Sequence, residues 1–120
     1  MRLTHLALPV ADRARSRAFY GTHFGFAAGP AQECEDGILI IRDAHGFDLA
    51  LVPAGVLPEQ PHLHFGFRCA DAAEVHTLLR HVTDHGISVV ERVTGTTFSS
   101  FKCLDPDGYQ VEAYWDGTQQ

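Results

Sequence analysis

The sequence predicts an α+β fold made of two βαβββ modules, whose curved mixed sheets surround a cavity and carry their helices outside. A spacing of seven residues separates His5 from Asp12, and the same spacing separates His64 from Asp71. In each half a strand-like stretch, a helical pattern, a glycine and hairpin strands follow in the same order. The 120 residues, 45% of them hydrophobic and 20% charged, are typical of a single globular domain.

The first module is expected to span residues 1–56. Residues 2–10 alternate in character as a short strand does, and the Asp12 carboxylate can cap the helix that follows. The β-branched run at 38–41 suits a buried strand. In chain order we expect a strand over 2–10, a helix after Asp12, a strand over 38–41, a turn over 43–46, a return strand over 47–52 and a linker over 53–61.

The second module is expected to span residues 57–120. Asp71 can cap its helix, and the Asp-Pro-Asp-Gly sequence at 105–108 favours a turn because proline fixes φ and glycine tolerates positive φ. A repeat this short cannot bury a core alone, so the two modules are expected to pack together. In chain order we expect a strand over 64–69, a helix closed by Gly86, strands over 87–93, 99–104 and 110–115, and frayed residues over 116–120.

The composition argues against several classes of protein. The formal net charge is −6, whereas nucleic-acid binding favours a basic face. No apolar run approaches the ~18 residues of a membrane span, and no basic start precedes an apolar segment. The cysteines, Cys34, Cys69 and Cys103, lack C-x-x-C spacing and are expected to be reduced thiols. We therefore expect a cytoplasmic protein that binds neither nucleic acid nor a membrane.

Three stretches of the chain carry a resemblance to a known family. Residues 10–20 (VADRARSRAFY) precede an FGF sequence at 24–26, residues 64–67 read HFGF, and residues 101–112 read FKCLDPDGYQVE. These stretches resemble the first helix, the opening strand of the second module and the final hairpin of the glyoxalase/bleomycin-resistance/extradiol-dioxygenase superfamily, also called the vicinal oxygen chelate superfamily. The resemblance covers residues 3–116 and is more specific for the fold than for a reaction.

The resemblance implies a metal site. Metal-using members take ligands from the first strand of each half and from the last strand, and His5, His64 and Glu112 stand at those positions. Two imidazoles and a carboxylate leave coordination sites open for substrate or oxygen, and they suit Mn²⁺, Fe²⁺, Ni²⁺ or Zn²⁺. His62 shares the face of His64 by strand alternation, so it stays open as an alternative ligand or a supporting group.

The resemblance also marks a gap in the first half. Glyoxalase-type lyases carry a further ligand on the last strand of that half, and the pattern Leu49-Ala-Leu51 places Ala50 there. Asp48 lies two residues earlier on the same face, where it is either a catalytic base or a solvated strand residue. With alanine in the fourth position, the three-ligand set is closer to fosfomycin-resistance transferases and extradiol dioxygenases than to lactoylglutathione lyases.

Substrate-binding candidates lie on the strands of the second half. Ser100 and Lys102 match a serine and a tyrosine that line the cavity of fosfomycin-resistance relatives, and Lys102 could hold an anionic oxygen or face solvent. Arg68 shares the face of His64 and could bind a carboxylate or lie in water. Tyr114 shares the face of Glu112 and could shape a pocket or belong to the core.

Two functions follow from the resemblance. The first is a divalent-metal-dependent lyase, isomerase or dioxygenase acting on a small oxygen-rich substrate, with Glu112 and Asp48 as candidate catalytic groups. The alternative is a metal-free small-molecule or drug-binding protein of the bleomycin-resistance type, for which the acidic balance would suit a cationic ligand. A partner-binding domain with incidental histidines is the least specific interpretation. Members of the family usually form homodimers, so a homodimer is expected here.

Overall fold

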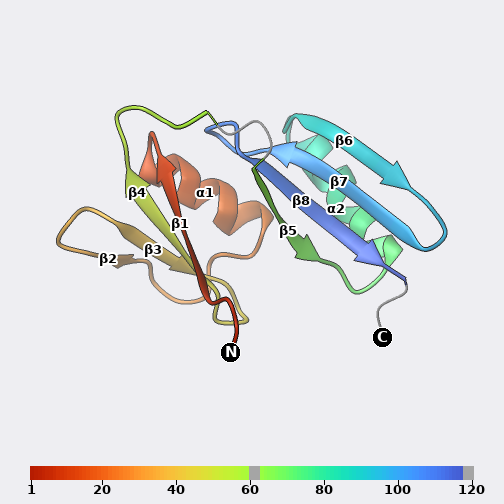
Figure 1. Ribbon diagram of the computed structural model, residues 1–120, viewed down its shortest axis with the longest axis horizontal. Helices are drawn as coiled ribbons and strands as arrows, with labels where there is room; N and C mark the ends of the chain where they lie inside the picture. The colour runs from red at the N-terminus through yellow and green to blue at the C-terminus, as the bar shows by residue number, and fades with distance from the viewer. Residues whose placement is uncertain (60–62, 118–120) are drawn as a thin grey trace. The chain divides into compact units, whose positions relative to one another are not determined.

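The computed structural model describes residues 1–59 and 63–117 of the chain. The chain divides into two compact units, Met1–Glu59 and Gln60–Gln120. Each unit contains a strand, a helix and three further strands in chain order, which confirms the predicted α+β fold with its repeated βαβββ module (Figure 1). His62 and residues 118–120 lie outside the described residues. The expectation that the chain frays from residue 116 onward was wrong for Asp116, which ends the last strand and pairs with Phe98. Neither helix within the described residues is long and apolar enough to cross a membrane.

The first unit has one four-stranded sheet in the order β1-β4-β3-β2. Strand β1 runs parallel to β4, and the other pairs are antiparallel. The two-residue β2 was not expected, and the first strand is shorter than predicted. The elements are β1 (His5–Val10), α1 (Arg13–His23), β2 (Gln32–Glu33), β3 (Leu39–Arg42) and β4 (Asp48–Pro53).

The second unit repeats this topology in the order β5-β8-β7-β6. Strand β5 runs parallel to β8, and the remaining pairs are antiparallel. Its strands lie within one or two residues of the predicted bounds. The elements are β5 (His64–Arg68), α2 (Ala72–Asp84), β6 (Val89–Thr94), β7 (Phe98–Leu104) and β8 (Gln110–Asp116).

Both helices begin where the sequence predicts them to begin. The Asp12 Oδ1 accepts the backbone N–H of Arg15 at 3.1 Å, and the Asp71 Oδ1 accepts the backbone N–H of Glu74 at 2.8 Å. Each aspartate thus satisfies a backbone donor that the first helical turn leaves without an intrahelical partner. After α2, Gly86 adopts a φ of 73°, which a side chain rarely tolerates, so the chain can turn out of the helix there.

In each unit the helix covers one face of its sheet, and the buried side chains alternate along the strands accordingly. Most candidate site residues lie on strands of the second unit. Because the buried side chains of these strands face the helix, the residues between them point to the opposite face of the sheet. In the first unit the core contains Leu8, Val10, Phe19, Tyr20, Ile41, Leu49 and Leu51. In the second unit it contains Val75, Val82, Phe101, Cys103, Val111 and Ala113.

A β-bulge interrupts the pairing of β6 with β7. Val89 pairs with Cys103, but Glu91 pairs with Lys102, so Val90 is an extra residue in β6. Without the bulge, regular antiparallel pairing would place Glu91 opposite Phe101, a core residue. The extra residue therefore brings the Glu91 side chain to the face of the sheet that carries Lys102.

Candidate functional site

Most of the predicted site residues gather on one face of the second sheet, which we call the polar face. This is the face opposite the buried side chains that pack under α2. Pairing registers arrange it in rows that run across the strands. One row contains His64, Gln110 and Leu104, the next contains Gly66, Glu112, Lys102 and Glu91, and the third contains Arg68, Tyr114, Ser100 and Val93.

The structure brings two of the three predicted metal ligands together on this face. His64 on β5 is exposed and pairs with Gln110, while Glu112 lies two residues further along β8, opposite Gly66. His64 and Glu112 are therefore diagonal neighbours on adjacent strands. The Glu112 side chain makes no hydrogen bond or ion pair within the described part of the chain, and its cross-strand neighbour on β7 is Lys102.

Gly66 is the reason why the Glu112 carboxylate has room. A Cβ at position 66 would lie 3.2 Å from the Glu112 Cβ and 3.3 Å from its Oε1. A glycine inside a strand often marks a place where another group approaches closely. Sequence analysis did not select Gly66, although a glycine inside a strand, on the same face as His64 and Arg68, could have indicated a close approach at this position.

Lys102 lies between two carboxylates. Its ammonium forms an ion pair with the Glu91 Oε2 at 2.8 Å, and its side chain is 19% exposed. The hydrogen bond to Glu91 raises the pKa of the Lys102 ammonium, partial burial opposes that shift, and the charges of Glu91 and Glu112 add to it. Lys102 is therefore a fixed positive charge beside Glu112. Sequence analysis missed Glu91 because the bulge that places it has no clear sequence signal.

Arg68 and Tyr114 form a second cluster on the polar face. The Arg68 Nε and Nη2 donate to the Tyr114 hydroxyl at 3.3 and 3.2 Å, and the guanidinium carbon lies 5.3 Å from the centre of the ring. Phe98 stacks on the other side of this cluster, with its ring centre 6.5 Å from that of Tyr114. Ser100, which pairs with Tyr114, is buried. Phe98 is a further residue that sequence analysis did not select.

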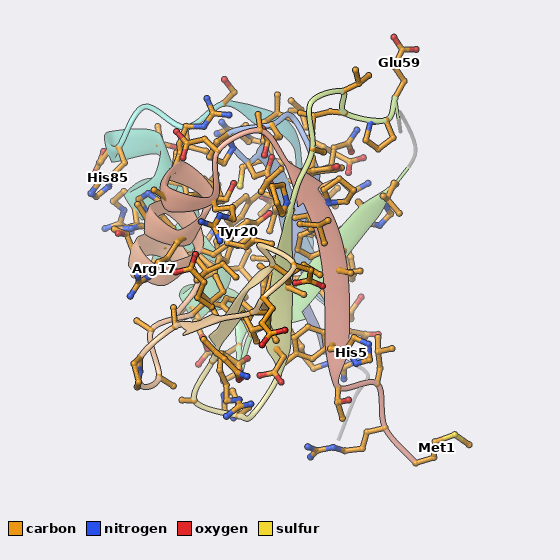
Figure 2. All side chains as sticks on the ribbon, turned by 90° about the vertical axis from the view of Figure 1, so that its left-hand side faces the viewer. Met1, His5, Arg17, Tyr20, Glu59 and His85 are labelled. Atoms are coloured by element: carbon orange, nitrogen blue, oxygen red, sulfur yellow. The ribbon has the colours of Figure 1, made fainter. Side chains whose placement is uncertain are left out.

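The first sheet repeats the register of the second. His5 pairs with Asp48 and Ala7 pairs with Ala50, just as His64 pairs with Gln110 and Gly66 pairs with Glu112. His5 is thus the counterpart of His64, and it lies exposed at the start of β1 (Figure 2). Ala50 is the counterpart of Glu112, so the first half holds no carboxylate at the position of that ligand.

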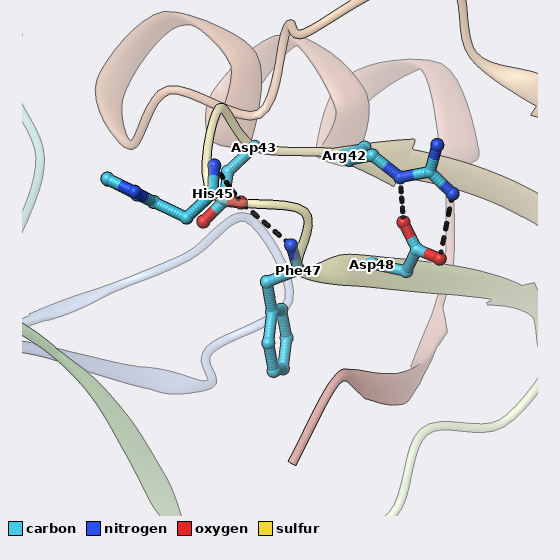
Figure 3. Close-up of polar contacts among 5 residues, drawn as sticks. All are labelled: Arg42, Asp43, His45, Phe47 and Asp48. Atoms are coloured by element: carbon cyan, nitrogen blue, oxygen red, sulfur yellow. Dashed lines mark hydrogen bonds and ion pairs between the residues drawn. The ribbon is translucent and has the colours of Figure 1, made fainter. Parts of the chain in front are cut away.

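Asp48 is engaged with a neighbouring strand. The Arg42 Nε and Nη2 donate to its two carboxylate oxygens at 2.6 and 3.1 Å (Figure 3). These hydrogen bonds lower the pKa of the Asp48 carboxyl, partial burial opposes the shift, and the charges of Arg42 and His5 reinforce it. A carboxylate held in this way is a weaker base than a free one. Asp48 remains a candidate catalytic group only if this ion pair opens.

The residues of the polar face fit a divalent metal. His64 offers an imidazole and Glu112 offers two oxygens, which are donors that Mn²⁺, Fe²⁺, Ni²⁺ and Zn²⁺ accept. Glycine at position 66 lets the Glu112 carboxylate lie close to β5, since a Cβ there would be 3.3 Å from the Glu112 Oε1. These donor types are the ones that such a metal accepts within the second unit.

Comparisons with known proteins agree with the fold. The sequence profile of the Glyoxalase/Bleomycin resistance protein/Dioxygenase superfamily matches residues 2–113. No curated protein matches the chain.

Three solved structures illustrate the likeness. A possible glyoxalase from Bacillus cereus has a TM-score of 0.78 and 24% identity, over 94% of this chain and 97% of that one. Lactoylglutathione lyase from Agrobacterium tumefaciens has a TM-score of 0.74 and 21% identity, over 98% and 95%. The genomically encoded fosfomycin resistance protein FosX from Listeria monocytogenes has a TM-score of 0.77 and 19% identity, over 96% and 93%. At these identities the likeness shows the fold alone. The family profile, however, spans most of the chain, and the chain therefore belongs to the glyoxalase/bleomycin resistance protein/dioxygenase superfamily.

Proposed function

We propose that this protein is a divalent-metal-dependent enzyme that acts on a small oxygen-rich substrate. His5, His64 and Glu112 would hold the metal, which we expect to be Mn²⁺, Fe²⁺, Ni²⁺ or Zn²⁺. The observation that supports this most strongly is the strand register, which makes Glu112 a diagonal neighbour of His64 on the polar face, where Gly66 lets its carboxylate lie close to β5. His5 at the repeated position in β1 supplies the third donor of the proposal.

A bound metal would supply Lewis-acid stabilisation of a developing anionic oxygen, or activation of dioxygen. The chain's own residues would do the rest. Lys102, kept protonated and fixed by Glu91, would place a positive charge beside an anionic substrate oxygen. Ser100 and Tyr114, in the neighbouring row, would contact the substrate. His62, outside the described residues, stays an alternative to His64.

The reaction class is proposed as lyase, isomerase or dioxygenase chemistry. Ala50 in place of a fourth ligand weighs against a lactoylglutathione lyase reaction, because no carboxylate stands there to transfer a proton. Asp48 would serve as the base only after release from Arg42. The resemblance to fosfomycin-resistance transferases in the final hairpin is weakened by Ala7, which stands where those proteins carry a threonine.

Metal titration tests the proposal. Calorimetry of tag-free protein with Mn²⁺, Fe²⁺, Ni²⁺ and Zn²⁺ should find one ion per site, lost in His5→Ala, His64→Ala and Glu112→Ala. The matched control is His45→Ala, which removes an exposed imidazole from a turn of the first half. Failure to bind any of the four metals would reject the proposal. Stabilisation by a cationic glycopeptide without metal would then favour the drug-binding alternative.

A homodimer in the cytoplasm belongs to the same proposal. Sedimentation equilibrium would measure the mass of the assembly. Mixing His5→Ala with Glu112→Ala protein would then show whether one site draws ligands from two chains, because a mixed dimer would regain one intact site if it does.

A further inference from the structure

Arg68 is a positive charge that the fold orients without neutralising it. Its Nε and Nη2 both donate to the Tyr114 hydroxyl, so this edge of the guanidinium is occupied. Arg68 is exposed, and it forms no ion pair with a carboxylate anywhere in residues 1–59 and 63–117. The edge formed by Nη1 and Nη2 therefore presents two parallel N–H groups to an incoming ligand.

The geometry of that edge matches one chemical group best. Two parallel N–H donors on a planar cation fit the two oxygens of a carboxylate, and such bidentate pairs are stronger than single hydrogen bonds. The Tyr114 hydroxyl and ring hold the guanidinium plane, so less side-chain entropy is lost when a ligand binds. The cluster is thus arranged in advance for a carboxylate.

Apolar surface adjoins this cation. Phe98 stacks on Tyr114 with an angle of 24° between the rings and remains 38% exposed. Val93, in the same row as Arg68, is 43% exposed. Aromatic and branched side chains side by side bind a flat apolar body by stacking and burial. A ligand held by Arg68 would lie with its body toward Phe98, whereas Val93 lies on β6, at the opposite edge of the sheet, and extends the apolar surface further from Arg68.

The row of Glu112 lies next to the row of Arg68. Two residues of strand separate neighbouring rows, which corresponds to about 6.6 Å. The carboxylate on Arg68 would thus be separate from the oxygens that reach the metal position. Glu112 and Asp116 flank Tyr114 on β8 and carry negative charges, so a metal on Glu112 should strengthen the binding of an anion.

We infer that Arg68, oriented by Tyr114, binds the carboxylate of the substrate, and that the substrate is a small carboxylate with an aromatic or other flat apolar body. The inference rests on the proposed function because it takes the polar face to be the substrate-binding face. Arg68 sets the specificity, and Tyr114 acts as a positioning residue through it. Phe98 contributes the apolar contact.

The test compares phenylacetate with phenylacetamide, which has the same shape without the charge. Binding to the full chain is followed by NMR titration, first without metal and then with the metal that binds best. Phenylacetate should bind at least about tenfold more tightly than the amide, since hydrogen bonds to charged groups contribute more than neutral ones. Arg68→Met should abolish this preference, while Arg68→Lys and Tyr114→Phe should retain part of it. Arg92→Met, which removes an exposed arginine paired with Phe101 on the same sheet, should retain all of it.

The outcomes separate this inference from the metal proposal. Equal affinity of the wild-type protein for the two probes, or an undiminished preference in Arg68→Met, would overturn the inference whether or not metal binds. A carboxylate preference that depends on Arg68 in a protein that binds no metal would support the inference and reject the metal-dependent enzyme. Circular dichroism of each variant would establish that the fold is retained, and the partial effect of Arg68→Lys provides a second measurement should Arg68→Met unfold.

Discussion

The space at Gly66 leads to a prediction about metal affinity. In Gly66→Ala, the added Cβ would lie 3.2 Å from the Glu112 Cβ and 3.3 Å from both its backbone oxygen and its Oε1. Ordinary contacts between carbon atoms lie at about 3.5–4.0 Å, so Glu112 must move by a few tenths of an ångström. Rotation of the Glu112 side chain can relieve the contact with Oε1, whereas the contacts with its Cβ and backbone oxygen require β5 and β8 to shift slightly apart.

The expected magnitudes differ for stability and for metal binding. An off-rotamer glutamate costs about 0.5–1.5 kcal/mol, while replacing glycine by alanine in a strand recovers about 0.5–1 kcal/mol. The free energy of unfolding of the metal-free variant should therefore change by less than about 1 kcal/mol. Misplacing a ligand through its neighbour typically lowers metal affinity ~10–100-fold. That loss corresponds to about 1.4–2.7 kcal/mol of binding free energy.

Calorimetric metal titration and urea unfolding of the same samples measure both quantities. Gly55→Ala is the matched control, because a Cβ there would meet nothing within 4 Å. It should leave metal affinity and stability unchanged. If Gly66→Ala bound metal as tightly as the wild-type protein while Glu112→Ala bound none, the argument that glycine makes room for the ligand would be wrong.

Three further predictions concern stability and reactivity. The buried Ser99 hydroxyl has no hydrogen-bond partner among the described residues, so Ser99→Ala should stabilise the protein by about 1 kcal/mol in urea unfolding; a loss of stability would reveal an unseen partner. Arg42 lowers the pKa of Asp48, so Asp48→Asn should be less heat-stable than the wild-type protein at neutral pH. This difference between the two proteins should vanish as the pH falls below about 3.8 and Asp48 becomes protonated. A difference in melting temperature that persists in acid would refute this linkage. Burial raises the pKa of both Cys69 and Cys103 to about 11, so a disulfide reagent at pH 8 should label these two thiols only after unfolding. The free energy of unfolding should fall above about pH 9, because the unfolded chain releases these protons at a lower pH than the folded one. Fast labelling of any thiol other than Cys34 in the native protein would contradict this.

The sequence predicts the fold well because its helix caps and strand patterns are local signals and because both occur in each of the two halves. Asp12 and Asp71 can cap helices wherever they precede a helical pattern, and both do so in the structure. Alternation along β8 correctly separates the core from the polar face, and along β7 only the buried Ser100 departs from this pattern. The two-residue β2 escapes prediction, since its pairing with β3 depends on the sheet rather than on its own residues.

The candidate site is less predictable because it depends on cross-strand neighbours. Alternation places Lys102 and Arg68 on the polar face. It does not reveal that Glu91 forms an ion pair with Lys102 or that Tyr114 orients Arg68. The pairing of Asp48 with Arg42 across a hairpin was likewise hidden, although the two residues lie close in sequence. Each of these partners depends on which strands lie side by side and on the position of the bulge, neither of which a single strand's sequence pattern reveals.

The extra residue in β6 has a consequence for how this half tolerates changes in chain length. Deleting Val90 would convert the bulged strand into a regular one in which Val89 still faces Cys103 and Glu91 still faces Lys102. A deletion elsewhere in β6 would turn every later side chain to the wrong side of the sheet. Position 90 is thus where homologous chains can gain or lose one residue while the ion pair beside Glu112 survives, and alignments of this segment should place their gaps there.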